Sequence, residues 1–150
     1  MSQEEYIDVM ADYVTRLQLG IDKFLTANAH VLSEFQLEIC KTILDPDTDQ
    51  DDLKVANTLI HQKIDILEKA GWSPVKTNSG DMVDRPVHYD RIPIEPTFFA
   101  QEYGLDWVTA NPLKYVCRFP FKNGIEDLRK TMRYNAMKIR WLDGDPEWSK

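Results

Sequence analysis

Basic side chains recur at short spacings in the C-terminal half of the chain, a pattern typical of a site that binds phosphate. Lys114 and Arg118 are four residues apart, so a helix would place both on one face. Lys122 and Lys130 follow within a short stretch. An arginine fork grips two phosphate oxygens, and a lysine supplies a compact positive charge. The sequence contains no glycine-rich loop ending in Gly-Lys-Ser or Gly-Lys-Thr, so side chains and helix N-termini must hold the phosphate.

Neighbouring residues of other types complete the candidate set. His88 could donate to a phosphate or carry a proton, and Tyr89 follows it. Among the aromatic residues, Tyr115 is the candidate for stacking on a base. Glu126 and Asp127 fall in the first turn of an expected helix, where acids bind Mg²⁺, orient a hydroxyl or complement the helix dipole. Two structural alternatives stay open: the cations form a solvated ion network with these acids, and the histidine is structural.

The elements that must position this set are expected to be short helices. Pro96 to Tyr103 is one, and Asn111-Pro112 reads as the N-cap and first residue of the next, which must end near Pro120. The last helix is expected to begin at Gly124 or Ile125 and to continue to residue 142. A weak extended stretch covers residues 87–94.

The N-terminal half shows apolar residues at the three- and four-residue spacing of amphipathic helices. A first stripe starts behind a capping box, Ser2-x-x-Glu5, and a second ends at Asp45-Pro46. Whether they form two helices or one bent helix depends on residues 26–29. An Asp-rich loop at 45–52 precedes a third helix that ends at Gly71. These stripes are expected to form core or an oligomer surface.

The sequence therefore predicts a mainly α protein: an N-terminal amphipathic helical hairpin or bundle, followed by a small helical domain. The expected divisions are a helical region at 1–71, a linker at 72–86 rich in turn-forming residues, a helical domain at 87–143 and a tail at 144–150. The 43% hydrophobic content is enough for a buried core.

Charge and cysteine content narrow the function classes. The net charge is −7, yet residues 1–75 carry 14 acids and 6 bases while residues 76–150 carry 11 and 12. Because nucleic-acid affinity depends on neutralising many phosphates, this balance favours a small anion over nucleic acid. Cys40 and Cys117 are too few for a disulfide scaffold or a zinc site. The sequence shows no signal peptide and no membrane span, so a cytoplasmic protein is expected.

A combined pattern in residues 84–142 resembles a known family. It comprises Pro86-x-His88-Tyr89, then Asn111-x-Leu113-Lys114-Tyr115-x-x-Arg118-x-x-x-Lys122, then Glu126-Asp127-Leu128-x-Lys130-x-x-x-Tyr134. The pattern is similar to that of small phage proteins typified by the atypical nucleotide kinase that T7-like phages make early in infection. The chain departs from that family at Ala110, at Phe119-Pro120 and at Thr131, while the charged set is intact.

The resemblance implies a deoxynucleoside monophosphate kinase without a P-loop, acting as a homo-oligomer in the cytoplasm of an infected bacterium. It implies catalytic roles for His88, Lys114, Arg118 and Asp127. The implied substrate-binding residues are Tyr89, Asn111, Tyr115, Lys122 and Lys130. The cofactor would be Mg²⁺ with a nucleoside triphosphate donor, although no metal ligand is assigned. The N-terminal helices would supply the oligomer contact.

Three other functions stay open on sequence. The first is a phage host-takeover or anti-defence protein that binds a bacterial target or sequesters a nucleotide, which the acidic N-terminal half favours. The second is an all-α pyrophosphatase, for which Glu34/Glu38 and Glu126/Asp127 would supply the acids. The third is a nucleic-acid mimic, for which the acids are poorly spaced.

Overall fold

The computed structural model describes residues 1–75 and 92–150, and within these ranges the chain is mainly helical, as the sequence predicts. The helices are α1 (Gln3–Asn28), α2 (Glu34–Leu44), α3 (Gln50–Lys69), α4 (Pro96–Tyr103), α5 (Trp107–Arg118) and α6 (Ile125–Leu142), with a 3-10 turn, η2 (Phe119–Phe121), after α5. None of the described helices is long and apolar enough to cross a membrane. Most of the extended stretch expected at 87–94 lies outside the described residues.

The two N-terminal stripes form two helices, which resolves the alternative left open at residues 26–29. α1 ends at Asn28, and α2 begins after Ser33. The Ser33 hydroxyl accepts from the Gln36 backbone N–H, and the Gln36 side chain accepts from the Ser33 N–H. This capping box gives α2 a strong start, because it satisfies two backbone donors that a helix terminus leaves unpaired.

The Asp-rich loop caps α3, as the sequence predicts. Asp49 and Asp52 exchange hydrogen bonds between side chain and backbone, with distances of 2.9 and 3.1 Å. The acids of this first turn also complement the positive end of the helix dipole. α3 then ends before Gly71, which adopts a left-handed φ of 64°.

The start of α5 corrects the sequence prediction, which placed it at Asn111-Pro112. α5 begins at Trp107, and Asp106 is its N-cap, accepting from the Thr109 N–H at 2.9 Å. Gly104, in the left-handed region, ends α4 two residues earlier and so fixes where the chain turns. Pro112 lies inside the helix, where it cannot donate the hydrogen bond that an interior residue gives to the carbonyl four residues before it.

The turn from α5 into α6 is tight and depends on a glycine. η2 carries Pro120 and stops the helix where the sequence predicts, and Gly124 precedes α6 with a φ of 60°. A Cβ at Gly124 would lie 2.9 Å from the Pro74 ring and 3.2 Å from Trp72. Any larger residue there would therefore push the chain after α3 away from the start of α6.

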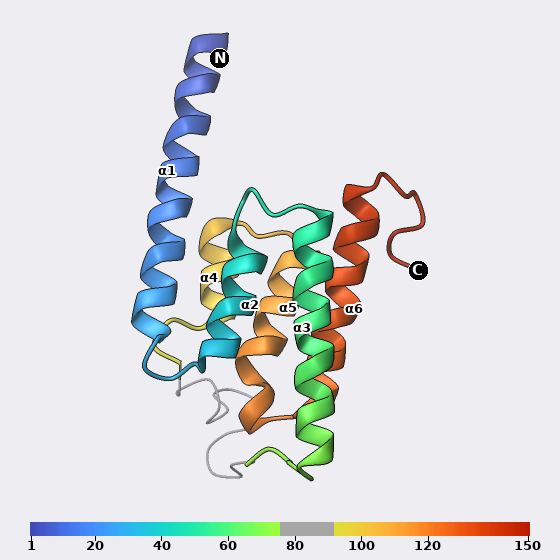
Figure 1. Cartoon of the computed structure of the whole chain (residues 1–150). Helices are drawn as coiled ribbons and strands as arrows, with labels where there is room; N and C mark the ends of the chain where they lie inside the picture. Colours follow the sequence, from blue (N-terminus) through green and yellow to red (C-terminus); the bar gives the residue numbers. More distant parts are fainter. Residues whose placement is uncertain (76–91) are drawn as a thin grey trace.

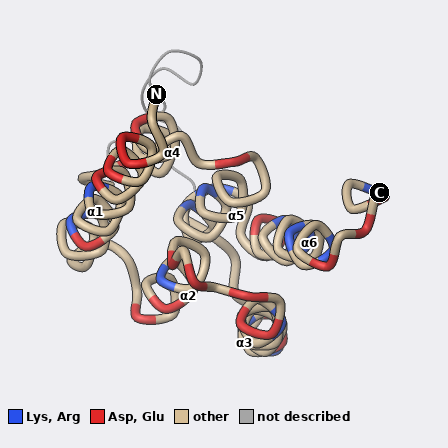
Figure 2. The backbone as a smooth tube through the Cα atoms, turned by 90° about the horizontal axis from the view of Figure 1, so that it is seen from above, with Lys and Arg blue, Asp and Glu red and all other residues tan. Residues whose placement is uncertain are grey.

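The core centres on α5, which lies between α2, α4 and α6, while α3 packs against α6 and α2 (Figures 1 and 2). One cluster of buried apolar side chains joins helices from both sides of residues 76–91. Gln36 ties α2 to α5 by donating to the carbonyls of Val116 and Cys117 at 3.0 and 3.1 Å. The thiols of Cys40 and Cys117 are buried 3.6 Å apart, and the hydrogen bond between them, with burial, raises the pKa of Cys117.

α1 extends well beyond the other helices (Figure 1). Its buried residues begin only at Gly20, where the helix packs closely on the Tyr103 ring. Below that point Ile21 and Phe24 enter the core. The N-terminal turns of α1 therefore project from the body of the protein.

Candidate phosphate-binding site

Three of the four basic residues singled out from the sequence gather around one aromatic ring, and the fourth, Lys122, lies close enough to Arg118 and Lys130 to be repelled by them. Lys114 and Arg118 come from α5, Lys122 follows η2, and Lys130 comes from α6. The Lys114 ammonium lies 4.7 Å from the centroid of the Tyr115 ring, the Arg118 guanidinium 4.6 Å and the Lys130 ammonium 5.4 Å. Cations at these distances are attracted to the ring face, so Tyr115 holds the cluster together.

Arg118 is fixed in this cluster by Asp127. Its Nε and Nη2 donate to the two carboxylate oxygens at 3.3 and 3.1 Å. The Asp127 side chain is completely buried and also accepts from the Asn123 N–H at 3.1 Å. Asp127 therefore contacts Arg118 and the turn before α6. Its role here is to orient the guanidinium.

Two lysines of the cluster, Lys114 and Lys122, have no ion-pair partner among the described residues. Among the described residues, no acidic side chain lies within 4.0 Å of Lys114 or Lys122. Burial and repulsion by neighbouring cations, Arg118 foremost, hold the pKa values of both lysines below their usual 10.5, against the opposing pull of Asp127. These ammonium groups are thus poised to gain a bound anion as partner.

The remaining cation is partly neutralised. Lys130 pairs with Glu126 at 3.3 Å across one helical turn, and both side chains are substantially exposed. Such exposed pairs contribute little stability and open readily. Within the described part of the chain, Asp127 and Glu126 counted against the four cations leave an excess of positive charge, so an ion network among these residues accounts for only part of the cluster.

Two residues that the sequence predicted for substrate binding, Asn111 and Tyr115, make contacts within the protein. Asn111 donates from its side chain to the Trp107 carbonyl at 2.9 Å, within its own helix. Tyr115 stacks on Tyr134 with ring centroids 5.9 Å apart. One face of the Tyr115 ring is therefore covered by protein and is not open to a base. His88 and Tyr89 lie outside the described residues.

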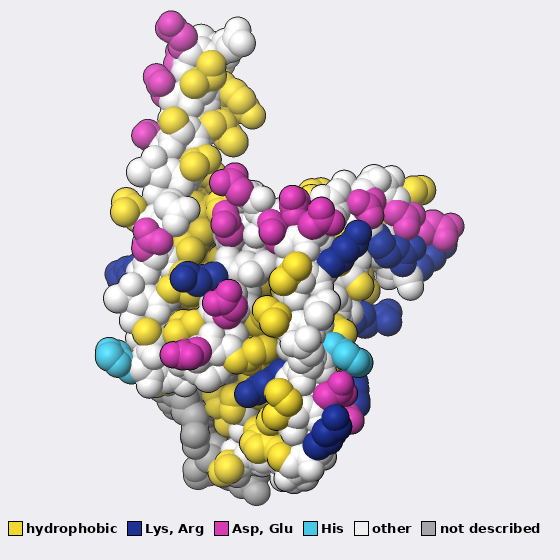
Figure 3. Space-filling view, in the orientation of Figure 1, with side chains coloured by type: hydrophobic (Ala, Val, Ile, Leu, Met, Phe, Trp, Pro, Cys, Tyr) yellow, Lys and Arg dark blue, Asp and Glu magenta, His cyan; other side chains and the backbone are white. Residues whose placement is uncertain are grey.

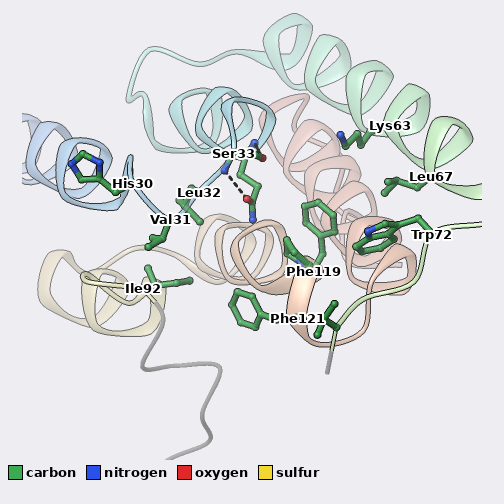
Figure 4. A pocket seen from close by; sticks show the side chains of 13 residues that line it. His30, Val31, Leu32, Ser33, Lys63, Leu67, Trp72, Ile92, Phe119 and Phe121 are labelled. Carbon is green, nitrogen blue, oxygen red and sulfur yellow. Dashed lines mark hydrogen bonds between the residues drawn. The ribbon is translucent and has the colours of Figure 1, made fainter. Parts of the chain in front are cut away.

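A large apolar hollow lies beside the cluster and was not anticipated from the sequence. Its volume is about 790 Å³, and Trp72, Phe119 and Phe121 contribute aromatic walls (Figure 4). Trp72 and Phe119 pack with ring centroids 5.8 Å apart. The signal that sequence reasoning overlooked is Trp72 itself, a large aromatic residue directly after the Gly71 that ends α3.

Two residues that line the hollow also contact the crevice beside the cationic cluster. Ile92 and Phe121 line the hollow, and both also line a small crevice bounded by Lys114 and Arg118. Figure 4 shows Ile92 and Phe121 on the same side of the hollow, with Trp72 and Leu67 opposite. Ile92 and Phe121 therefore connect the lining of the hollow to the part of α5 that carries Lys114 and Arg118.

Acidic side chains beside the cluster do not form a metal site. Glu126 is paired with Lys130, and Asp127 with Arg118. Within the described ranges, no three His, Cys, Asp or Glu side chains gather closely enough to hold a metal ion. Glu34 and Glu38 line a separate hollow with His30, so the described residues do not assemble the four-acid arrangement of a pyrophosphatase.

Comparison with known proteins gives one finding. No curated protein and no solved structure matches the chain. The stretch that does match a family includes α4, α5 and most of α6, and with them all four basic residues of the cluster. Over residues 83–136 the chain is similar to a family described as a protein of unknown function, DUF3310.

Proposed function

We propose that the protein binds a nucleotide by its phosphates and transfers a phosphoryl group to a deoxynucleoside monophosphate. The observation that carries the proposal is the cluster of Lys114, Arg118 and Lys130 around Tyr115, with Lys122 beside them, brought together from α5, α6 and the turn between them. Phosphoryl transfer depends mainly on positioning and charge neutralisation, which such a cluster supplies without a P-loop.

Each cation has a distinct part in the proposal. Lys114 and Lys122, which lack a carboxylate partner among the described residues, would bind phosphate oxygens as point charges. Arg118 keeps Nη1 free of the Asp127 contact and directs its remaining donors to a second phosphate. Lys130 would release the exposed Glu126 and bind the incoming anion in its place.

The apolar hollow supports a nucleotide over a simple inorganic anion. A base is flat and aromatic, and stacking on aromatic side chains stabilises it whatever its identity. Trp72 and Phe121 offer such surfaces in the hollow, and Phe121 also lines the crevice beside Lys114 and Arg118. Phosphates at Lys114 and Arg118 and a base against Trp72 would occupy both halves of the site at once.

In the proposed reaction, an acceptor phosphate oxygen attacks the γ-phosphorus of a nucleoside triphosphate. The bond from that phosphorus to the β-phosphate oxygen breaks, which yields two nucleoside diphosphates. The cations stabilise the negative charge on the transferring group and hold the attacking and leaving oxygens in line. Asp127 acts through Arg118, and no step depends on a metal ligand from the described residues.

A coupled assay tests the proposal. Each deoxynucleoside monophosphate is mixed with a triphosphate donor and Mg²⁺, and diphosphate formation is followed for the wild type, Lys114→Ala/Lys122→Ala and the control Lys54→Ala. Lys54 is an exposed lysine on α3. We expect turnover in the wild type and the control and its loss in the double variant. Absence of diphosphate with every pair, at concentrations that bind nucleotide, contradicts transfer.

A second candidate is nucleotide sequestration without catalysis, as in a phage anti-defence protein. It is favoured by one observation: Asp127, the buried acid beside the cluster, is held by Arg118 and by the Asn123 N–H, so it is not free to act as a base. Thermal unfolding with and without nucleotides separates the two, because a ligand that binds only the folded chain raises its stability by mass action. Stabilisation without turnover would identify sequestration, and neither effect would contradict both functions.

A further inference from the structure

A second hollow lies at the other end of α5 and α6 from the cationic cluster. It opens where α1 leaves the body, and its lining includes the start of α5 and the end of α6. Its volume is about 370 Å³, within the range of cavities that hold small molecules. Leu17, Leu53 and Val108 contribute apolar walls, and Trp141 adds an indole ring. The hollow therefore has the size and the apolar surface of a small-molecule site.

The lining also includes a buried amide that has one acceptor left over. Asn135 is only 1% exposed. Its Nδ2 donates to the Asn57 Oδ1 at 3.0 Å, and the Asn57 Nδ2 donates to the Met132 carbonyl at 3.1 Å. Among the described residues, none donates to the Asn135 Oδ1. A buried acceptor without a donor is costly, so a ligand that brings an N–H group to this oxygen gains a strong contact.

The ionisable side chains of the lining sum to a negative charge. Lys138 lies 2.9 Å from Asp106 and is neutralised by it. The other acid of the lining, Asp45, has no ion-pair partner in the described part of the chain, and its Oδ1 accepts from the Asp47 N–H at 2.9 Å. Figure 3 shows acidic groups along the top of the body, beside the projecting part of α1. The hollow therefore attracts a cation and repels an anion.

We propose that this hollow binds a small organic amine, that is, a protonated amine on a compact apolar or aromatic body. The amine N–H groups donate to the Asn135 Oδ1, and the net negative lining attracts the positive charge. The apolar body packs between Leu17 and Val108. A neutral molecule of the same shape lacks the attraction to Asp45, and an anion is repelled by it.

This site is separate from the proposed nucleotide site. Lys114 and Arg118 lie in the C-terminal half of α5, whereas the hollow takes its α5 lining from Val108 and Thr109 at the start of that helix. Lys130 likewise lies nearer the start of α6 than Trp141 does. Amine binding and phosphoryl transfer can therefore be tested, and can fail, independently.

Phenethylamine is the probe, and NMR of the isotope-labelled full chain follows its binding. The reporters are the side-chain amide of Asn135 and the indole N–H of Trp141. We expect both signals to shift along one saturable curve. Phenethyl alcohol keeps the aromatic body without the charge, and its affinity should be lower by about fivefold, as expected for the loss of one exposed ion pair. Absence of a saturable shift, or equal affinity for the two compounds, overturns the proposal.

Two neighbouring acids provide a matched pair of variants. Asp45→Asn removes the charge but keeps the side-chain oxygen that accepts from the Asp47 N–H, so the turn after α2 is retained. We expect this variant to bind phenethylamine about fivefold more weakly. Asp47→Asn is the control, because Asp47 is exposed on the same loop and does not line the hollow. Equal weakening in both variants would reflect only the general charge of the loop and overturns the assignment of the site.

A quaternary analogue tests the role of the buried amide oxygen. Phenethyltrimethylammonium keeps the charge and the aromatic body but has no N–H group to donate to the Asn135 Oδ1. We expect it to bind more weakly than phenethylamine and to leave the Asn135 amide signal nearly unshifted. Affinity and shifts equal to those of phenethylamine would overturn the proposed hydrogen bond to Asn135.

Discussion

Arg118 and Asp127 form a buried pair in which two guanidinium nitrogens donate to the two carboxylate oxygens, at 3.3 and 3.1 Å. The pair joins the last residue of α5 to the first turn of α6. Asp127 is fully buried and also receives the Asn123 N–H. The fold of this turn and the orientation of the phosphate-binding cation therefore depend on one carboxylate.

Replacing that carboxylate should destabilise the protein strongly. Asp127→Asn leaves the buried guanidinium without its counter-ion, and breaking such a pair costs about 3–5 kcal/mol. Urea denaturation measures the change in unfolding free energy. Glu126→Gln is the control on the next residue, where the ion pair with Lys130 is exposed and is worth at most about 1 kcal/mol. Similar losses in both variants would contradict the structural importance of the buried pair.

Removing the unpaired lysines should weaken ligand binding without weakening the fold. Each charged contact to a phosphate contributes about 1.5–3 kcal/mol, so Lys114→Ala or Lys122→Ala should lower nucleotide affinity by about 10- to 100-fold. Their lowered pKa values mean that protonation of either lysine opposes folding at neutral pH. Calorimetric titration and thermal unfolding measure the two effects. A large drop in melting temperature would show that these lysines serve the fold.

The fold class and most helix ends were predictable because they depend on local signals. The apolar period predicts helices, and Pro96, Gly71 and Pro120 set termini that the structure confirms. The start of α5 was not predictable in this way. Asn111-Pro112 has the composition of a helix start, but Asp106 competes for the same role and gains Lys138 as a tertiary partner at 2.9 Å. A contact between residues so far apart in sequence leaves no local signal.

The candidate site was also predictable from local spacing in part, while the rest of it depends on tertiary packing. The spacing of Lys114 and Arg118 on one helix predicted that they share a face, and the structure brings Lys122 and Lys130 to them. The aromatic hollow could not be predicted, because Trp72 and Phe121 lie far apart in sequence and meet only when the chain after α3 packs on the start of α6. The buried state of Asp127 likewise depends on packing that no spacing rule encodes.

The N-cap of α5 gives a prediction that tests its corrected start. Asp106→Ala removes the cap and the Lys138 contact, and loss of a cap alone costs about 0.5–2 kcal/mol. Asp106→Asn should retain most of that stability, since asparagine caps helices as well as aspartate does. Denaturant unfolding of both variants measures the difference. Equal destabilisation would assign the effect to the Lys138 ion pair and not to the cap.

Acid should remove the contribution of Asp106 to stability. Burial opposes its ionisation, but hydrogen bonds from Thr109 and Lys138 outweigh burial and hold its pKa below the usual 3.8. The contribution is therefore complete above 3.8 and is lost as the pH falls through the lower folded-state value. Unfolding free energies of the wild type and Asp106→Asn should converge in that acidic range. Curves that stay parallel through it would contradict the assignment.

Trp72 should distinguish recognition of the base from recognition of phosphate. Trp72→Leu keeps an apolar wall but removes the indole, and a base stack on an aromatic side chain is worth about 1–3 kcal/mol. We expect nucleotide affinity to fall by about tenfold while the affinity for inorganic pyrophosphate is unchanged. Trp107→Leu is the control, because Trp107 is 69% exposed and does not line the hollow. Equal weakening of both ligands would place the base elsewhere.

Nucleotide binding should weaken as the pH rises through the alkaline range, and should begin to do so below pH 10.5. Burial and the positive charges of neighbouring groups, Arg118 foremost, lower the pKa values of Lys114 and Lys122 from that usual value. Only the protonated ammonium attracts phosphate, so a bound phosphate raises both pKa values and the complex takes up protons. Titrations in two buffers with different ionisation enthalpies measure this uptake directly. In Lys114→Ala/Lys122→Ala the proton uptake should disappear, whereas in Lys54→Ala it should be unchanged. Uptake that persists in the double variant would mean that the phosphate is bound by other groups.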